Sequence, residues 1–146
     1  AAIGDIFSKE KIGQAKVLYC DELASGILYN DGHNKFSFKP FPLPAQESKI
    51  FGIVAEDFNN DGKKDILSSG NYFSYRVQLG RSDASLGLLM KGEDNGNFSA
   101  VDPPGSGVYI DGDVRAMVTV KNKSGEKLII VAKNNDTVQI LKVNEK

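Results

Sequence analysis

The same succession of short apolar runs and polar turns occurs twice in this chain, and this internal repeat limits its fold more than any other feature. Gly26-Ile27-Leu28 is matched by Gly87-Leu88-Leu89, 61 residues later, and Phe36-Ser37 is matched by Phe98-Ser99, 62 residues later. The offset changes by one residue because insertions fall in loops. Two copies of one pattern predict two copies of one structural unit. Each copy holds two hairpins, and four antiparallel strands are the unit of a β-propeller blade.

The residue types between the turns predict an all-β chain. The apolar runs are short and rich in Val, Ile, Leu, Phe and Tyr, which suit a pleated, half-buried surface. Hairpin-type turns containing Gly and Asn or Asp separate them, as at Asn30-Asp31-Gly32, Asp61-Gly62 and Asn95-Gly96. Strands are predicted at residues 15–20, 26–30, 35–41, 50–57, 65–70, 86–91, 97–101, 113–120, 127–133 and 137–143.

We therefore expect a single domain over residues 1–146, built as two four-stranded β-propeller-type blades behind a short N-terminal helix. Residues 1–14 form the helical segment, since Ile6, Phe7 and Ile12 alternate with charged residues up to Ala15. Residues 15–83 form the first blade, and residues 84–146 form a second, degenerate blade with an extra C-terminal strand. Two blades cannot close a ring, because propellers typically have about four to eight. The chain is thus expected to be the remainder of a larger propeller or to assemble with copies of itself.

Charge and composition exclude several function classes. The chain has 18 basic and 19 acidic residues, which gives no electrostatic reason to expect nucleic acid or an anionic membrane as a partner. No apolar run approaches the roughly 20 residues that span a bilayer, so no membrane insertion is expected. No signal peptide stands at the start, and Cys20 is the only cysteine. No nucleophile elbow, phosphate-binding loop or zinc cluster is present, and we expect a protein that is not an enzyme.

The segment from Asp57 to Asp65 reads D-x-N-x-D-G-x-x-D and predicts a calcium site. Calcium prefers oxygen ligands supplied by a tight turn, and oxygen-bearing side chains occupy the first, third, fifth and ninth positions around a glycine. A polar hairpin turn without metal is the alternative, but it would not need three carboxylates close together, which repel each other unless a cation lies among them. The expected ligands are the side chains of Asp57, Asn59, Asp61 and Asp65 and the backbone carbonyl of Lys63.

The residues around this segment favour a loop between strands over an EF-hand. An EF-hand needs a bidentate glutamate at its twelfth position, which here is Ser68. The run Ile50 to Ala55 enters the segment and Ile66-Leu67 leaves it, both rich in strand-forming residues.

Phe51-Gly52, followed by the stretch from Ala55 to Leu67, resembles the FG-GAP (VCBS-type) repeat. That repeat builds the β-propellers of integrin α-subunits and of many large secreted bacterial proteins. The turns at residues 28–36 and 91–98 resemble the other hairpin of the family, and the resemblance covers residues 15–143. It implies one structural calcium ion and an extracellular or cell-surface location. In the second repeat, residues 120–128 retain only Asn122 among the ligand positions, so we expect no ion there.

The irregular stretch from Asn71 to Ser85 is the other candidate site. Tyr75, Arg76, Arg81 and Asp83 could form a ligand-binding surface, or the aromatic residues could pack between blades while Arg81 pairs with Asp83. The expected function is a non-enzymatic, extracellular calcium-binding module that recognises a protein or a glycan. The alternatives are an accessory or catalytic domain of a carbohydrate-active enzyme and a purely structural pair of blades.

Overall fold

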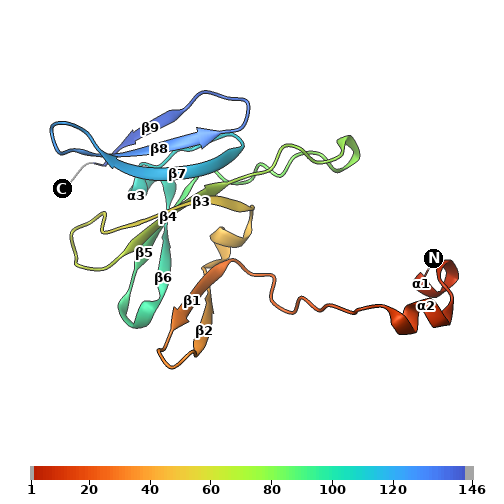
Figure 1. Ribbon diagram of the computed structural model, residues 1–146. Helices are drawn as coiled ribbons and strands as arrows, with labels where there is room; N and C mark the ends of the chain where they lie inside the picture. The colour runs from red at the N-terminus through yellow and green to blue at the C-terminus, as the bar shows by residue number, and fades with distance from the viewer. Residues whose placement is uncertain (1, 144–146) are drawn as a thin grey trace.

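A computed structural model describes residues 2–143 of the 146-residue chain, and its dominant elements are β-strands in three antiparallel sheets (Figure 1). The all-β prediction is confirmed. The strands are β1 (Gly26–Asn30), β2 (Phe36–Pro40), β3 (Ile50–Glu56), β4 (Asp65–Gly70), β5 (Leu88–Gly92), β6 (Phe98–Val101), β7 (Val114–Lys121), β8 (Lys127–Lys133) and β9 (Gln139–Lys142).

The helices are all short. The N-terminal region holds two of them, not the single short helix predicted for residues 1–14, because Phe7 adopts an extended conformation (φ −119°, ψ 143°) and Ser8 then caps a new helix. None of the helices in residues 2–143 has the length and apolar character needed to cross a bilayer. The helices and 3₁₀ turns are α1 (Ile3–Ile6), α2 (Lys9–Gln14), η1 (Leu43–Gln46), η2 (Val77–Leu79), η3 (Asp94–Gly96) and α3 (Pro103–Ser106).

The sheets divide the chain differently from the predicted repeats. The orders are β1-β2, β3-β4-β5-β6 and β7-β8-β9, so the sheets have two, four and three strands and not four in each repeat. β4 pairs with β5 across the predicted boundary between residues 83 and 84, with Ile66 opposite Met90 and Leu67 opposite Leu89. The physical reason lies in β4, whose six residues are all buried. Such a strand needs a partner on both edges to satisfy its backbone polar groups.

The strand predicted at residues 15–20 does not form. Residues 16–23 have no regular secondary structure, and Leu18 and Tyr19 are 78% and 81% exposed. Apolar residues with high strand propensity form a strand only beside another strand, and the fold places none next to this segment.

The core is divided between the two faces of the four-stranded sheet. On one face, Val54 and Leu67 pack with Val114 and Val131 from the three-stranded sheet. On the other face, Ile66 and Met90 pack with Phe41 and Ala45, next to the β1-β2 hairpin. The four-stranded sheet therefore lies between the other two sheets, as Figure 1 shows.

Candidate functional site

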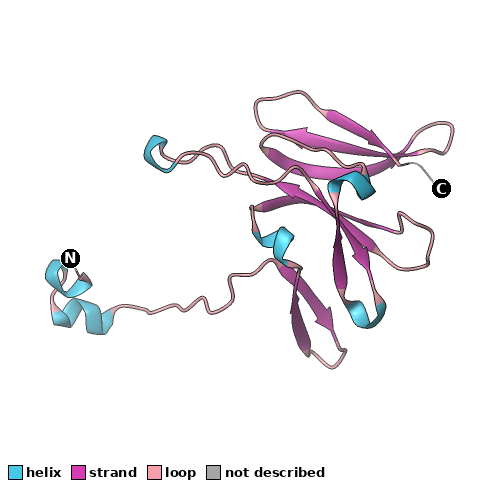
Figure 2. Cartoon of the chain, turned by 180° about the vertical axis from the view of Figure 1, so that it is seen from behind, coloured by secondary structure: helices cyan, strands magenta, loops and turns pink. Residues whose placement is uncertain are grey.

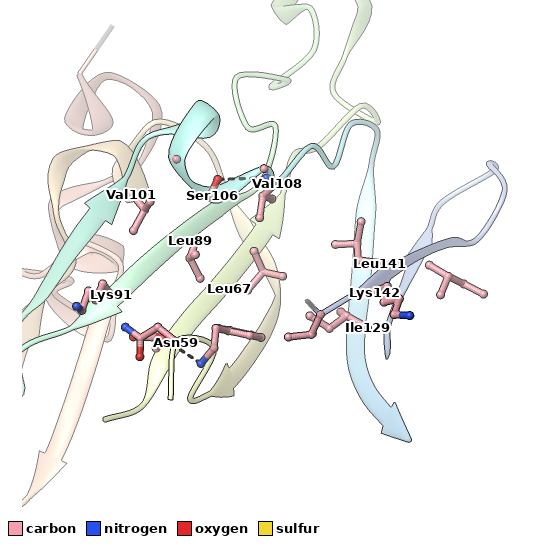
Figure 3. Close-up of a pocket in the computed structure, with 16 residues that line it drawn as sticks. Asn59, Leu67, Leu89, Lys91, Val101, Ser106, Val108, Ile129, Leu141 and Lys142 are labelled. Carbon is pink, nitrogen blue, oxygen red and sulfur yellow. Dashed lines mark hydrogen bonds between the residues drawn. The ribbon is translucent and has the colours of Figure 1, made fainter. Parts of the chain in front are cut away.

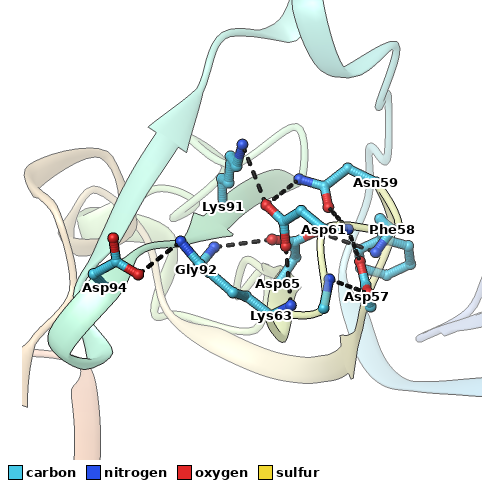
Figure 4. A network of polar contacts seen from close by, with 10 residues as sticks. Asp57, Phe58, Asn59, Asp61, Lys63, Asp65, Lys91, Gly92 and Asp94 are labelled. Carbon is cyan, nitrogen blue, oxygen red and sulfur yellow. Dashed lines mark hydrogen bonds and ion pairs between the residues drawn. The ribbon is translucent and has the colours of Figure 1, made fainter.

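The acidic segment forms the loop between β3 and β4, at one end of the four-stranded sheet (Figure 4). The two strands are antiparallel, and Glu56 opposite Asp65 is the last pair of the ladder before the loop. The predicted strand–loop–strand context is confirmed, and no helix flanks the loop as an EF-hand requires.

Side-chain oxygens of this loop accept hydrogen bonds from the loop's own backbone N–H groups. The carboxylate of Asp57 accepts hydrogen bonds from the backbone N–H of Asp61 (3.2 Å) and of Gly62 (2.8 Å). Asn59 Oδ1 accepts from the Asp61 N–H (3.0 Å), and Asp61 Oδ1 accepts from the Lys63 N–H (2.9 Å). These bonds bring three of the predicted ligands to one turn. An ionised carboxylate has about four lone-pair sites, so each acid retains further acceptor capacity.

Asp65 has a different place from the other predicted ligands. Its side chain is buried (2% exposed), whereas the loop tip is open to solvent. Asp65 Oδ2 accepts from the Phe58 N–H (3.1 Å), and Oδ1 accepts from the Gly92 N–H (2.9 Å). A Cβ atom on Gly92 would lie 2.2 Å from the carbonyl oxygen of Lys64, so only glycine allows this approach. Asp65 thereby fastens the loop to the end of β5.

Two lysines bring positive charge to the loop. Lys91 Nζ lies 3.3 Å from Asp61 Oδ2, and Lys63 Nζ lies 2.9 Å from Asp94 Oδ1. The backbone N–H of Lys63, followed by the Asn59 amide and Lys91, lowers the pKa of Asp61 below its ordinary value of 3.8. The bond to Asp94 raises the pKa of Lys63. The stability due to Asp61 is thus fully present above about pH 4 and is lost as the pH falls through its folded-state pKa.

The donor chemistry of the loop fits a calcium ion, with one conflict. Carboxylate, amide and carbonyl oxygens are the ligands that calcium takes. Within residues 2–143, however, no three His, Cys, Asp or Glu side chains converge as a metal-holding group. The oxygens of Asp57, Asp61 and Asp65 face separate N–H donors, and Lys91 shares Asp61 Oδ2. An ion in this loop would therefore compete with the Lys91 ammonium.

The matching turn of the second repeat contains one carboxylate. Asn122 Oδ1 accepts from the backbone N–H of Ser124 and of Glu126, both at 2.9 Å. The Glu126 carboxylate accepts from Lys142 Nζ and from the Asn122 amide, and these bonds lower the pKa of Glu126. Protein donors thus balance the only negative charge of this turn.

The four residues predicted to bind a ligand differ in the contacts that they make. Tyr75 packs edge-on against Tyr72, with ring centroids 4.9 Å apart, and Lys49 Nζ lies 4.1 Å from the Tyr75 centroid. Arg81 instead lies over the ring of Phe73, at 4.9 Å. The ion pairs of the described residues do not include Arg81 with Asp83, and no side-chain contact of Arg76 is among them.

Sequence reasoning missed the residues that surround Tyr75. The Arg115 guanidinium lies 4.8 Å from the centroid of Phe51 and 5.1 Å from that of Tyr72. The Arg115 guanidinium forms an ion pair with the carboxylate of Asp113 (2.8 Å), a residue that is only 1% exposed. Arginine occurs only three times in the chain, and its rarity is the sequence feature that could have drawn attention to Arg115. We name Lys49, Phe51, Tyr72, Tyr75 and Arg115 the aromatic–cation cluster.

A cleft of about 660 Å³ opens between the four-stranded and three-stranded sheets (Figure 3). Asn59, Lys91 and Lys142 lie among its polar lining residues. Most other lining side chains are aliphatic, and we refer to this space as the apolar cleft. They include Leu67, Leu89, Val101, Val108, Ile129, Ile140, Leu141 and Val143.

Comparison with known proteins gives no match: no protein-family model, curated protein or solved structure matches this chain. The resemblance to FG-GAP repeats therefore stays a prediction.

Proposed function

We propose that this chain is a non-enzymatic, extracellular calcium-binding module of the FG-GAP type that recognises a protein or a glycan. The observation that carries the proposal is the β3–β4 loop, in which Asp57, Asn59 and Asp61 lie in one strand–loop–strand turn and accept hydrogen bonds from its backbone N–H groups. The ion is structural: when bound, it supplies positive charge that holds the loop acids together.

The proposed architecture is a partial propeller. β3 to β6 follow one another in chain order and in sheet order, as the strands of one blade do. β3 and β7, the first strands of successive sheets, lie against each other, and a Cβ atom on Gly52 would lie 2.7 Å from the Met117 side chain. On this proposal, β1-β2 and β7-β8-β9 are parts of the two neighbouring blades.

Calcium is expected to raise the melting temperature, and replacing Asp61 is expected to abolish that rise. Binding to the folded state alone stabilises it by about 2.7 kcal/mol when free calcium is about 100 times Kd. Asp61→Asn keeps an acceptor oxygen for the Lys63 N–H and loses only an ion pair at the surface, which contributes little, so the metal-free protein should melt close to the wild type. Calorimetry in calcium and in chelator measures both values.

Asp111→Asn is the matched control, because Asp111 also has a lowered pKa and pairs with Lys133, outside the loop. It should retain the full calcium response. Identical melting curves of the wild type in calcium and in chelator would remove the ion from the proposal.

Removal of the Lys91 ammonium is expected to tighten calcium binding. The charge lies 3.3 Å from Asp61 Oδ2 and opposes any cation held there. Lys91→Met should lower Kd by about fivefold, which is the order expected for one unit charge near a solvated site. Titration calorimetry at two salt concentrations measures it. Unchanged or weaker binding would mean that the ion does not use Asp61.

The aromatic–cation cluster is the proposed recognition surface. Aromatic faces and a guanidinium held by a buried acid suit sugar rings and polar groups of a partner. A glycan array probed with and without calcium is expected to show binding that Tyr75→Ala weakens by tenfold or more (about 1.4 kcal/mol). Val77→Ala, an exposed change in the same loop, should leave it intact. Equal binding by Tyr75→Ala and the wild type would place the surface elsewhere.

A further inference from the structure

The N-terminal arm, residues 2–24, exposes apolar side chains that its own fold does not cover. Figures 1 and 2 both show it leaving the body at β1 and ending in α1 and α2, well away from the sheets. Val17 and Leu23 are 61% and 86% exposed, and Leu18 and Tyr19 are also largely exposed. An exposed apolar run of this kind indicates a surface that another protein covers.

The segment of the arm from Lys16 to Glu22 has the properties of a strand without a neighbour. Val17, Leu18, Tyr19 and Cys20 form an apolar run that suits a pleated sheet, and Figure 1 shows the chain drawn out between α2 and β1. Its backbone donors and acceptors are free to pair with the edge of a sheet.

β9 offers such an edge. It pairs with β8 on one side, and none of the described strands pairs with the other side. The ladder continues past the strand end, where the Val143 N–H donates to the Lys127 carbonyl (3.2 Å). Ile140 is 60% exposed, and it lines the apolar cleft together with Leu141 and Val143. A strand added here would cover the cleft as well as the edge.

The edges of β2, β6 and β7 are less suitable. β2 ends at Pro40, which cannot donate to a ladder, and only Asp102 separates the end of β6 from Pro103 at the start of α3. β7 already lies against β3.

We propose that residues Lys16–Glu22 of one copy of this chain add as a strand to the free edge of β9 in a second copy. The added strand extends the three-stranded sheet to four strands and lays apolar side chains over the cleft. The donor is a second copy because the arm leaves its own body in the direction away from β9 in both views. Addition of a strand to a free sheet edge needs no calcium. Asn59 and Lys91 line the cleft that the strand covers, so the assembly is measured in chelator, where no ion occupies the loop.

Cys20 allows a direct test, since it is the only cysteine and lies in the proposed strand. One protein is the wild-type chain with Cys20 converted to its mixed disulfide with thionitrobenzoate. The other carries Cys20→Ser and Ile140→Cys. On mixing, the introduced thiolate attacks the Cys20 sulfur, a disulfide joins the two chains, and thionitrobenzoate leaves and is measured by its absorbance. The matched control carries Cys20→Ser and Ser37→Cys, which places an exposed thiol on β2.

We expect release at least tenfold faster with the thiol on β9 than with the thiol on β2, together with a covalent dimer on a denaturing gel. Equal rates would overturn the proposal. A single chain carrying native Cys20 and Ile140→Cys should likewise form disulfides between chains when oxidised glutathione is added as the oxidant, and an intrachain disulfide in the monomer fraction would overturn the proposal too.

Sedimentation equilibrium provides the second measurement. The wild type should associate in the presence of chelator, and the double variant Leu18→Asp, Tyr19→Asp should be monomeric. Its melting temperature should equal that of the wild type diluted until it is monomeric, because both side chains are exposed within one chain. A wild type that stays monomeric at all concentrations, or a double variant that associates equally, would contradict the proposal.

Discussion

Replacement of Asn71 by alanine is expected to lower the free energy of unfolding by about 4 kcal/mol. Asn71 is 1% exposed, and its side chain makes four hydrogen bonds. Nδ2 donates to the carbonyls of Ser85 (2.8 Å) and Gly112 (3.0 Å). Oδ1 accepts from Ser48 Oγ (2.8 Å) and from the Ser85 N–H (2.9 Å). Alanine leaves these groups buried without partners, and such groups cost more than the bonds themselves contribute.

The backbone of Asn71 adds a smaller cost that a second variant separates. Its φ of 81° lies in the left-handed region, which asparagine tolerates and alanine does not. Asn71→Gly loses the same four hydrogen bonds without this strain, so it should be about 1 kcal/mol more stable than Asn71→Ala. Urea unfolding of both variants measures the difference. A loss below about 1 kcal/mol for Asn71→Ala would show that the four bonds are not formed together.

The hydrogen bonds of Asn71 also connect segments that carry the aromatic–cation cluster. The bond from Asn71 to Gly112 joins the loop that carries Tyr72 and Tyr75 to the segment that leads into Arg115. The repeat uses the corresponding residue in a similar way, since Asn134 donates from its backbone to the Asp113 carbonyl (2.8 Å) and from Nδ2 to Asp113 Oδ2 (3.2 Å). Asn134 follows Asn71 by 63 residues, close to the offset of the internal repeat, and both asparagines join loops of the fold.

Local patterns in the sequence predict where strands lie but not which strands pair. β1, β4 and β8 have the bounds that their apolar runs and turns predict, 26–30, 65–70 and 127–133. The pairing of β4 with β5 depends on burial of β4 from both sides, which involves residues far apart in the chain. The segment at residues 15–20 has the composition of a strand but no partner, and composition cannot supply one.

The acidic loop was predictable because its side chains act within nine residues, whereas the groups around it come from elsewhere. Lys91 and Gly92 reach the loop from the end of β5, in the next repeat. The aromatic–cation cluster likewise joins β3, the loop after β4 and β7, three segments that only the folded sheets bring together. No spacing rule in the sequence expresses such contacts.

Replacement of Asp65 by alanine is expected to cost about 3 kcal/mol in chelator, where no ion contributes. The carboxylate is buried and is the acceptor for the Phe58 and Gly92 N–H groups, at 3.1 and 2.9 Å. Both donors lose their partner in Asp65→Ala, and the link between the loop and β5 is broken. Asp65→Asn keeps the shape but turns an amide NH₂ toward one of the two donors, so about half of this cost is expected.

Variants of Asp61 and Asp65 distinguish two roles of the acidic loop: binding of calcium and anchoring of the loop to β5. Asp61 is exposed at the loop tip and Asp65 is buried beneath it, so Asp61→Asn should lose the calcium response with little change in chelator. Asp65→Asn should lose stability in chelator, and it should lose the calcium response as well only if Asp65 is a ligand. Chemical unfolding of both variants in calcium and in chelator gives the four values needed. Asp65→Ala with wild-type stability in chelator would contradict the anchoring role, because two buried N–H groups cannot be left unpaired without cost.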